Sequence, residues 1–269
     1  MRIAVAQMGV ESGETAANVM SAISAIETAR DEGVEFLILP ECGLTGYGFA
    51  DRTALESGSL TARSEAVGAV AEAAATANMH VVFGFFETFE GKIYNTAQLV
   101  GPTGVLGTHR KRHLPFLGGD RFADRSVDAS PSVYETPFGK VGIAICYEIR
   151  FPEAVRTLML SGAEIVALPT NWPEDSVMLA EHFTKVRAAE NMIFFAAANR
   201  NDSDGDTKYL GMSQIVDPLG KVLVNAEQES GVFWADIDVG RAREKKIVFR
   251  PGEFEITPVA DRQPQTYRN

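Results

Sequence analysis

The chain has 269 residues, of which 45% are hydrophobic and 23% are charged, as in a globular protein large enough to bury a sizeable core. Its net charge of −11 and pI of about 4.9 argue against nucleic acid or anionic membranes as partners, because both need clustered Lys and Arg. Two cysteines are too few for a disulfide framework, no signal-peptide pattern is present, and no apolar stretch approaches the roughly 18 residues of a membrane span. We therefore expect a cytoplasmic protein without membrane contact.

Helix-like and strand-like periodicities alternate along the chain, with turn-forming residues between them. Apolar residues at helical spacing predict helices at 15–32, 61–78, 152–161 and 176–191. Short apolar or alternating runs predict strands at 2–8, 36–39, 80–87, 95–100, 105–110, 141–145, 165–168, 193–198, 212–216, 222–225 and 232–236. We expect the last three to be antiparallel strands joined by tight turns.

This alternation predicts an α/β fold with a mixed sheet or sheets and helices on the outer faces. The middle of the chain has no linker-like composition, so we expect a single domain over residues 1–269. The chain becomes charged and then proline-rich after Gly240, and we expect an extended C-terminal tail from about residue 248.

Three predicted strands end in a reactive side chain: Glu41 after Leu39-Pro40, Lys111 after His109-Arg110, and Cys146 after Ala144-Ile145. In open α/β sheets, ligands bind outside the carboxyl ends of strands, so these three groups could converge. A thiolate can attack a carbonyl, a carboxylate can move protons, and an ammonium can hold the oxyanion. Each residue also has a plainer interpretation: Cys146 as a small buried hydrophobe, Glu41 as a loop or capping carboxylate, and Lys111 as part of a solvated basic edge.

The segments around these residues resemble the nitrilase superfamily of carbon–nitrogen hydrolases, in order and over nearly the whole chain. Six motifs carry the resemblance: Leu39-Pro40-Glu41 with Leu44-Thr45-Gly46-Tyr47; Arg110-Lys111-Arg112-His113-Leu114; Ile145-Cys146-Tyr147-Glu148-Ile149-Arg150-Phe151-Pro152-Glu153; Leu168-Pro169-Thr170-Asn171-Trp172; Arg187-Ala188-Ala189-Glu190-Asn191; and Gly211-Met212-Ser213 with Asp217-Pro218-Leu219-Gly220. The resemblance implies a four-layer αββα sandwich with a catalytic triad of Glu41, Lys111 and Cys146. It also implies subunits that pair into homodimers or larger homo-oligomers.

Two positions depart from the family pattern. Glu148 stands where many members have Asp, and we assign no effect to this change. Many members also have a second glutamate between the lysine and cysteine motifs, which positions the substrate. Here Asp120 is the nearest candidate for that role, and its shorter side chain would need a closer loop. An ion pair with Arg121 or a capping contact would explain Asp120 equally well.

Further residues are candidates for substrate binding. A backbone N–H near Tyr147 could hold the oxyanion, Asn171 follows a strand end and could hydrogen-bond substrate, and Trp172 could shape the pocket with Phe116 and Leu117. Several other groups have structural interpretations: a hydrogen bond for His113, and a buried, inert thiol for Cys42. We expect no cofactor and no metal, because no His, Cys and carboxylate cluster has metal-ligand spacing and no glycine-rich phosphate loop is present.

The resemblance implies an enzyme that hydrolyses non-peptide carbon–nitrogen bonds. Our first expectation is an amidase that converts a small amide to an acid and ammonia through a cysteine thioester. A nitrilase and an N-carbamoyl hydrolase are the alternatives within the class. A catalytically idle interaction subunit and an acyltransferase are alternatives of a different class, although an idle copy would have no need to keep all three reactive residues.

Overall fold

The computed structural model describes residues 1–267. Its helices are α1 (Thr15–Asp31), α2 (Arg52–Gly58), α3 (Glu65–Thr76), α4 (Pro152–Leu160), α5 (Thr184–Asn191) and α6 (Arg241–Glu244). Its strands are β1 (Arg2–Gln7), β2 (Phe36–Ile38), β3 (His80–Phe89), β4 (Lys92–Gly101), β5 (Gly104–Arg110), β6 (Val133–Thr136), β7 (Gly139–Ile143), β8 (Ile165–Pro169), β9 (Phe194–Ala198), β10 (Ser203–Asp204), β11 (Thr207–Lys208), β12 (Gln214–Val216), β13 (Val222–Asn225), β14 (Gly231–Asp236), β15 (Ile247–Arg250) and β16 (Phe254–Ile256).

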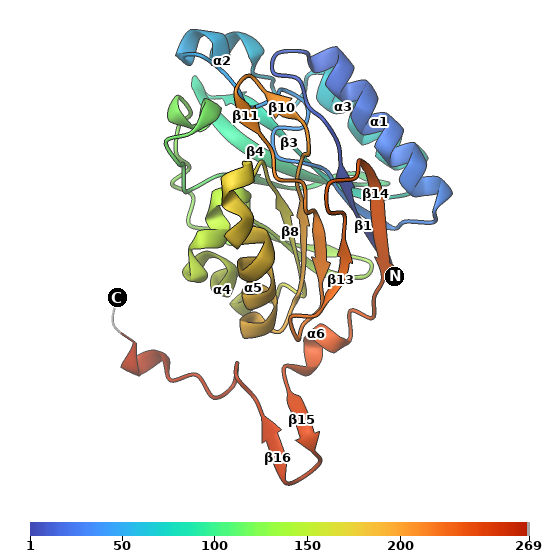
Figure 1. Cartoon of the computed structure of the whole chain (residues 1–269), viewed down its shortest axis with the longest axis vertical. Helices are drawn as coiled ribbons and strands as arrows, with labels where there is room; N and C mark the ends of the chain where they lie inside the picture. Colours follow the sequence, from blue (N-terminus) through green and yellow to red (C-terminus); the bar gives the residue numbers. More distant parts are fainter. Residues whose placement is uncertain (268–269) are drawn as a thin grey trace.

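Two six-stranded sheets pack face to face between two layers of helices (Figure 1). The first sheet has the strand order β14-β1-β2-β3-β4-β5, and α1 and α3 cover its outer face. The second sheet has the order β13-β12-β9-β8-β7-β6, with α4 and α5 on its outer face. This arrangement confirms the αββα sandwich that the family resemblance implied.

Alternation of side chains along the strands of the first sheet explains its two buried faces. Phe36 and Ile38 of β2 point between the sheets, whereas Leu37 points towards α1 and α3. Both sets are almost fully buried, which is why β2 consists of consecutive apolar residues. At about 1.5–3 kcal/mol for each large apolar side chain removed from water, these two cores hold the four layers together.

Parallel pairing places several strand ends on the same edge of each sheet. β2 lies between β1 and β3 and is parallel to both, while β7, β8 and β9 form a parallel set in the second sheet. β3, β4 and β5 are antiparallel neighbours. The loops that follow β2, β5, β7 and β8 carry the candidate site residues.

Two predicted helices differ from the observed ones, and one observed helix was not predicted. α3 begins only at Glu65, because Ser64 caps it and Leu60 bonds to the backbone of β3 instead. α2 was not predicted, since Asp51 caps it but it buries only Leu55 and so has no helical apolar spacing. The predicted helix at 176–191 is interrupted by a π-helical turn (Leu179–Phe183) before α5.

The expectation for the last three strands was partly wrong. β12 and β13 form the predicted antiparallel pair, but β14 pairs with β1 in the other sheet. The chain therefore crosses from the second sheet to the first after Asn225. There β14 pairs with β1 and forms the edge strand of that sheet. The tail is not simply extended either: α6 is followed by a hairpin of β15 and β16, and a short 3-10 turn at Pro264–Thr266.

Candidate active site

The structure brings Glu41, Lys111 and Asp120 into one buried cluster. The ammonium of Lys111 lies 2.6 Å from Glu41 Oε1 and 2.5 Å from Asp120 Oδ2, and all three side chains are fully buried. Lys111 follows directly after β5, Glu41 lies in the turn after β2, and Asp120 lies in a 3-10 turn, η1 (Gly118–Arg121). One cation between two carboxylates leaves the cluster with a formal charge of −1, so each carboxylate depends on the lysine for its burial.

Two residues outside the predicted set complete this cluster. Asn95 of β4 donates through Nδ2 to Glu41 Oε1 at 2.7 Å and to Asp120 Oδ1 at 2.9 Å. Tyr47 donates its hydroxyl to Asp120 Oδ2 at 2.9 Å. Tyr47 belongs to the glutamate motif, whereas no local pattern in the sequence distinguishes Asn95 as a site residue.

Burial and mutual charge shift the pKa values of the cluster. Burial raises the pKa of Glu41, and the charge of Asp120 raises it further, while Lys111 lowers it. Burial alone would lower the pKa of Lys111, but the charges of Asp120 and Glu41 hold it well above its ordinary value. The lysine is therefore a permanent cation, and Glu41 is a carboxylate that takes up a proton more readily than an exposed glutamate.

Cys146 stands at a sharp turn three residues beyond the end of β7 at Ile143. Its φ of +44° lies in the left-handed region, and the chain continues as a short 3-10 helix, η2 (Cys146–Arg150). We call residues 144–148 the cysteine elbow. A non-glycine residue costs about 1–3 kcal/mol in such a conformation and keeps it only where surrounding contacts enforce it. The elbow leaves Cys146 only 8% exposed.

The surroundings of the thiol favour its protonated form at rest. Burial, followed by the charge of Glu41, raises the pKa of Cys146 to about 12, against the opposing charge of Lys111. The hydroxyl of Thr170 and the backbone N–H of Asn171 lie near enough to its sulfur to lower the pKa. A proton acceptor is therefore needed to make the thiolate, and Glu41 is near enough for its charge to act on the sulfur.

The other predicted site residues occupy different environments. Asn171 donates through Nδ2 to the backbone oxygen of Glu41 at 2.9 Å, which ties the end of β8 to the turn after β2. Trp172 is buried, and its backbone N–H donates to Asn199 Oδ1 at 2.9 Å. Tyr147 is half-buried and packs edge-to-face on Phe151 at 5.2 Å. Cys42 is a fully buried free thiol, as expected.

Asp120 contacts the lysine and not Arg121, so the ion-pair alternative for it was wrong. Arg121 donates instead to the backbone oxygens of Gly118 and Phe49. The loop that carries Asp120 also lies close to Lys111, as the short aspartate side chain requires. A Cβ at Gly118 would come within 2.3 Å of the Tyr47 ring, and Gly118 has a φ of +48°.

Lengthening Asp120 should therefore damage the site. The Asp120→Glu variant adds one methylene to a closed cluster, which costs about 1–3 kcal/mol through overpacking. We expect turnover to fall at least about tenfold, because the Lys111 ammonium is displaced. Steady-state kinetics and thermal melting of the variant and the parent would check this, and a variant with parental turnover would contradict it.

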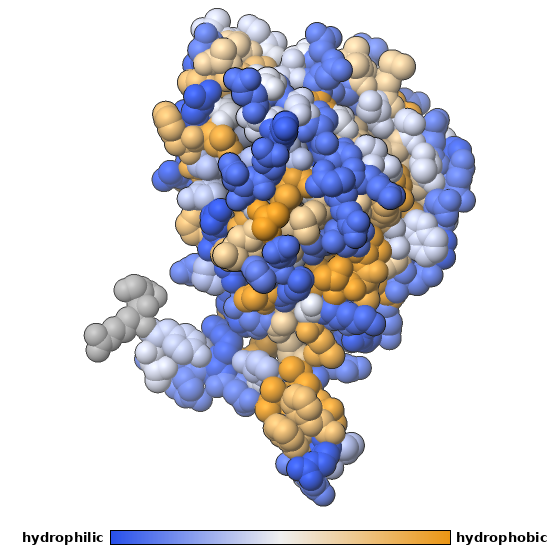
Figure 2. All heavy atoms as spheres, in the orientation of Figure 1, coloured by the Kyte–Doolittle hydropathy of each residue, from blue (hydrophilic) through white to orange (hydrophobic). Residues whose placement is uncertain are grey.

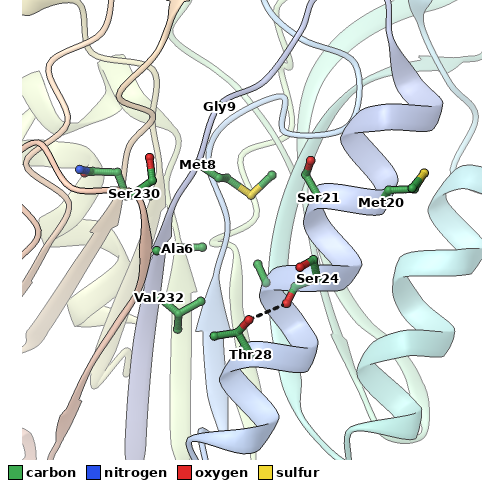
Figure 3. A pocket seen from close by; sticks show the side chains of 12 residues that line it. Ala6, Met8, Gly9, Met20, Ser21, Ser24, Thr28, Ser230 and Val232 are labelled. Carbon is green, nitrogen blue, oxygen red and sulfur yellow. Dashed lines mark hydrogen bonds between the residues drawn. The ribbon is translucent and has the colours of Figure 1, made fainter.

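One cavity lies away from this cluster. It has a volume of about 450 Å³ and opens between α1 and the strands β1 and β14, where Met8, Ser21 and Val232 point into it (Figure 3). Thr28 beside it already donates to the backbone oxygen of Ser24 at 2.9 Å. A second cavity, of about 340 Å³, borders the cluster itself through Asp120 and is lined by Phe116 and Arg121 among others.

Residues 1–267 contain no group of three or more His, Cys, Asp or Glu side chains that could hold a metal ion. No helix in that range is long and apolar enough to cross a membrane.

Known proteins of similar sequence were found over most of the chain. The family model of carbon–nitrogen hydrolases matches residues 2–247. A nitrilase of Pyrococcus abyssi is 32% identical over 249 residues, which cover 92% of this chain and 93% of that protein. A 2-oxoglutaramate amidase of Bacillus subtilis is 30% identical over 246 residues, covering 90% of this chain and 92% of that protein.

Solved structures agree with the fold. A mutant of the Nesterenkonia AN1 amidase, from the nitrilase superfamily, superposes with a TM-score of 0.84 over 98% of this chain and 95% of that chain, at 23% sequence identity. Both the family model and the two relatives span the glutamate, lysine and cysteine segments described above. The chain belongs to the carbon–nitrogen hydrolase family.

Proposed function

We propose that this hydrolase is an amidase that converts a small primary amide to its acid and ammonia, with Cys146 as nucleophile. The observation that carries the proposal is the buried cluster of Glu41, Lys111 and Asp120 beside the cysteine elbow. Nucleophile, proton carrier and cation are the three groups that acyl transfer from an amide requires.

The geometry supports a definite order of events. As substrate binds, Glu41 takes the proton from Cys146, and the sulfur attacks the amide carbon. Lys111 has three N–H donors, of which two are directed at Glu41 and Asp120, so the third is available for the oxyanion. The backbone N–H of Tyr147 is the second proposed donor.

Collapse of this intermediate breaks the carbon–nitrogen bond. Glu41 returns its proton to the departing nitrogen, ammonia leaves, and the acyl group remains on Cys146 as a thioester. Glu41 then takes a proton from water, whose oxygen attacks the thioester carbon. The thioester breaks, the acid is released, and the proton returns to the sulfur.

Two buried acceptors favour an amide over a nitrile. Glu41 Oε2 and Asn171 Oδ1 are buried and have no hydrogen-bond partner among residues 1–267. A buried acceptor without a partner is costly, so a ligand that brings N–H donors is favoured. A primary amide has two N–H bonds, whereas a nitrile has none. The hydroxyl of Thr170 and the indole Nε1 of Trp172, which is a donor, also have no hydrogen-bond partner among these residues.

Named relatives support both reactions of the class. The Bacillus subtilis protein is called a 2-oxoglutaramate amidase, and the Pyrococcus abyssi protein a nitrilase. In a mutant of the Nesterenkonia AN1 amidase, the acetamide moiety of fluoroacetamide is covalently attached to the active-site cysteine. That adduct shows, for that protein, a small amide fragment reaching the sulfur.

Ammonia release from a panel of substrates tests the proposal. We expect turnover of small aliphatic and amino-acid-like amides, with a transient acyl adduct on Cys146 detected by intact mass. The matching nitriles and N-carbamoyl compounds serve as the comparison set. Turnover of nitriles alone, or of carbamoyl compounds alone, would overturn the amidase assignment, and acyl transfer to an added amine in preference to water would show an acyltransferase.

The exposed C-terminal arm supports a homodimer. We call residues 247–267 the arm; its β15–β16 hairpin projects from the body and carries a cluster of apolar side chains (Figures 1 and 2). Phe249 is 58% exposed and Phe254 48% exposed, although their rings stack on each other at 4.6 Å. We propose that this surface is buried against a second subunit, which light scattering of the purified protein would check.

The two free thiols fit the proposed cytoplasmic location.

A further inference from the structure

A buried carboxylate joins the lysine segment to the cysteine elbow. Glu148 is 2% exposed and lies two residues after Cys146. Its Oε2 accepts the backbone N–H of Ile145 at 2.9 Å, and its Oε1 accepts the backbone N–H of Arg112, also at 2.9 Å. Ile145 directly precedes Cys146, and Arg112 directly follows Lys111. One carboxylate therefore spans the neighbours of two proposed catalytic residues.

A histidine fixes this carboxylate in place. His109 is 3% exposed, and its Nε2 lies 2.6 Å from Glu148 Oε2, while its Nδ1 lies 2.7 Å from the hydroxyl of Ser132. Both ring nitrogens are thus engaged, which fixes the plane of the imidazole. The charge of His109 and these hydrogen bonds hold the pKa of Glu148 well below its usual range, although burial acts to raise it. The Glu148 carboxylate is therefore negatively charged, and hydrogen bonds hold both of its oxygens.

The strained backbone at Cys146 needs such an anchor. Cys146 has a left-handed φ of +44°, and no glycine is present to relieve it. Glu148 accepts the backbone N–H of Ile145, which directly precedes Cys146. Glu148 also belongs to the 3-10 helix η2, which begins at Cys146. A conformation of this kind persists only where the surroundings over-determine it, and the Glu148 carboxylate supplies that constraint.

We propose that Glu148 is a positioning residue that sets the placement of Cys146 relative to Lys111, with His109 holding its carboxylate. The inference rests on the proposed roles of Cys146 and Lys111. It assigns a purpose to the residue that departs from the family pattern: an aspartate here would be one methylene shorter and could not reach both N–H groups in this backbone.

Two substitutions separate this role from simple packing. Glu148→Gln keeps the volume but has one acceptor oxygen and one amino group, so it must place a donor against either the Arg112 or the Ile145 N–H. Glu148→Asp keeps the charge beside His109 but shortens the span. The matched control is Asp217→Asn, because Asp217 is also buried and accepts two backbone N–H groups, of Leu219 and Lys221, and pairs with Arg241.

Kinetics of the folded variants test the proposal. We expect both Glu148 variants to lose about 100-fold in kcat with little change in KM, because a misplaced nucleophile slows chemistry more than binding. Asp217→Asn should keep its kcat. A Glu148→Gln enzyme within about twofold of the parent in kcat would overturn the proposal, and so would an equal loss in Asp217→Asn.

A substrate-independent measurement keeps this test separate from the amidase assignment. Iodoacetamide is a small amide that alkylates thiols, and peptide mass mapping distinguishes Cys146 from the buried Cys42. The alkylation rate of Cys146 should fall at least about fivefold in both Glu148 variants. If the parent hydrolyses no substrate, the amidase proposal fails while this comparison still stands. A Cys146 alkylation rate at or above the parental value would overturn the positioning role.

Discussion

The Cys146→Ala variant should lose at least about 10⁴-fold in amide turnover while keeping its fold, because the other thiol, Cys42, is fully buried and its Sγ donates to Asn95. The Thr170 hydroxyl lies near the sulfur, but it has no hydrogen-bond partner among residues 1–267 and therefore no base to activate it. The side chain of Cys146 is small and already 8% exposed, so its removal opens little space. Ammonia release and circular dichroism of the purified variant would measure both halves of this expectation.

The second cysteine provides the control. Cys42→Ala removes a thiol of the same size from a fully buried position next to Glu41, where it donates to Asn95 Oδ1 at 3.4 Å. We expect some loss of stability but retained turnover and retained acyl labelling. If Cys146→Ala still released ammonia at the parental rate, the nucleophile assignment would be wrong.

Replacing Lys111 with methionine should destabilise the fold as well as abolish turnover. The ammonium neutralises part of the charge of two fully buried carboxylates, Glu41 and Asp120. Removing one partner of a buried ion pair costs about 3–5 kcal/mol, since the remaining charge stays without compensation. Urea denaturation at neutral pH measures the free energy of unfolding, and ammonia release measures turnover.

A double variant separates the two effects of this change. Adding Asp120→Asn to Lys111→Met removes one of the two carboxylate charges that the lysine had compensated. The double variant should therefore recover part of the stability lost in Lys111→Met, without recovering turnover. Lys140→Met is the matched control, because Lys140 pairs with Glu135 at 2.9 Å on the surface, where ion pairs contribute little. Unfolding free energies that are the same for Lys111→Met and the parent would contradict the cluster's dependence on its cation.

Much of the site could be predicted because its residues stand at strand ends within recognisable motifs. Glu41 and Cys146 each follow an apolar run whose length and composition already indicate a buried strand, and Lys111 follows a strand of mixed composition, Gly104–Arg110. Asn95 was missed because it lies inside β4, where a single polar side chain has no local pattern to show which partners it will meet. Its hydrogen bonds to Glu41 and Asp120 form only where the turn after β2 and the loop that carries Asp120 meet β4, which is a property of the assembled sandwich.

The errors in the fold have the same physical origin. The alternation in β14 shows that it is a strand but does not identify its partner, so its pairing with β1 could not be deduced from periodicity. α2 is held by the cap of Asp51 and one buried leucine, too little for a helical pattern. Local propensity indicates elements well, whereas pairings distant in sequence are decided by packing.

The resting state of Cys146 has a consequence for the lifetime of the enzyme. A thiol with a pKa of about 12 carries almost no thiolate at neutral pH, and peroxide attacks the thiolate rather than the thiol. Burial also restricts the approach of dissolved oxidants. In the proposed mechanism Glu41 takes the proton only as an acyl donor arrives, so the sulfur would be reactive for a brief part of each cycle. The same burial that makes the thiol a weak nucleophile at rest protects it from conversion to sulfenic and sulfinic acids between encounters with substrate.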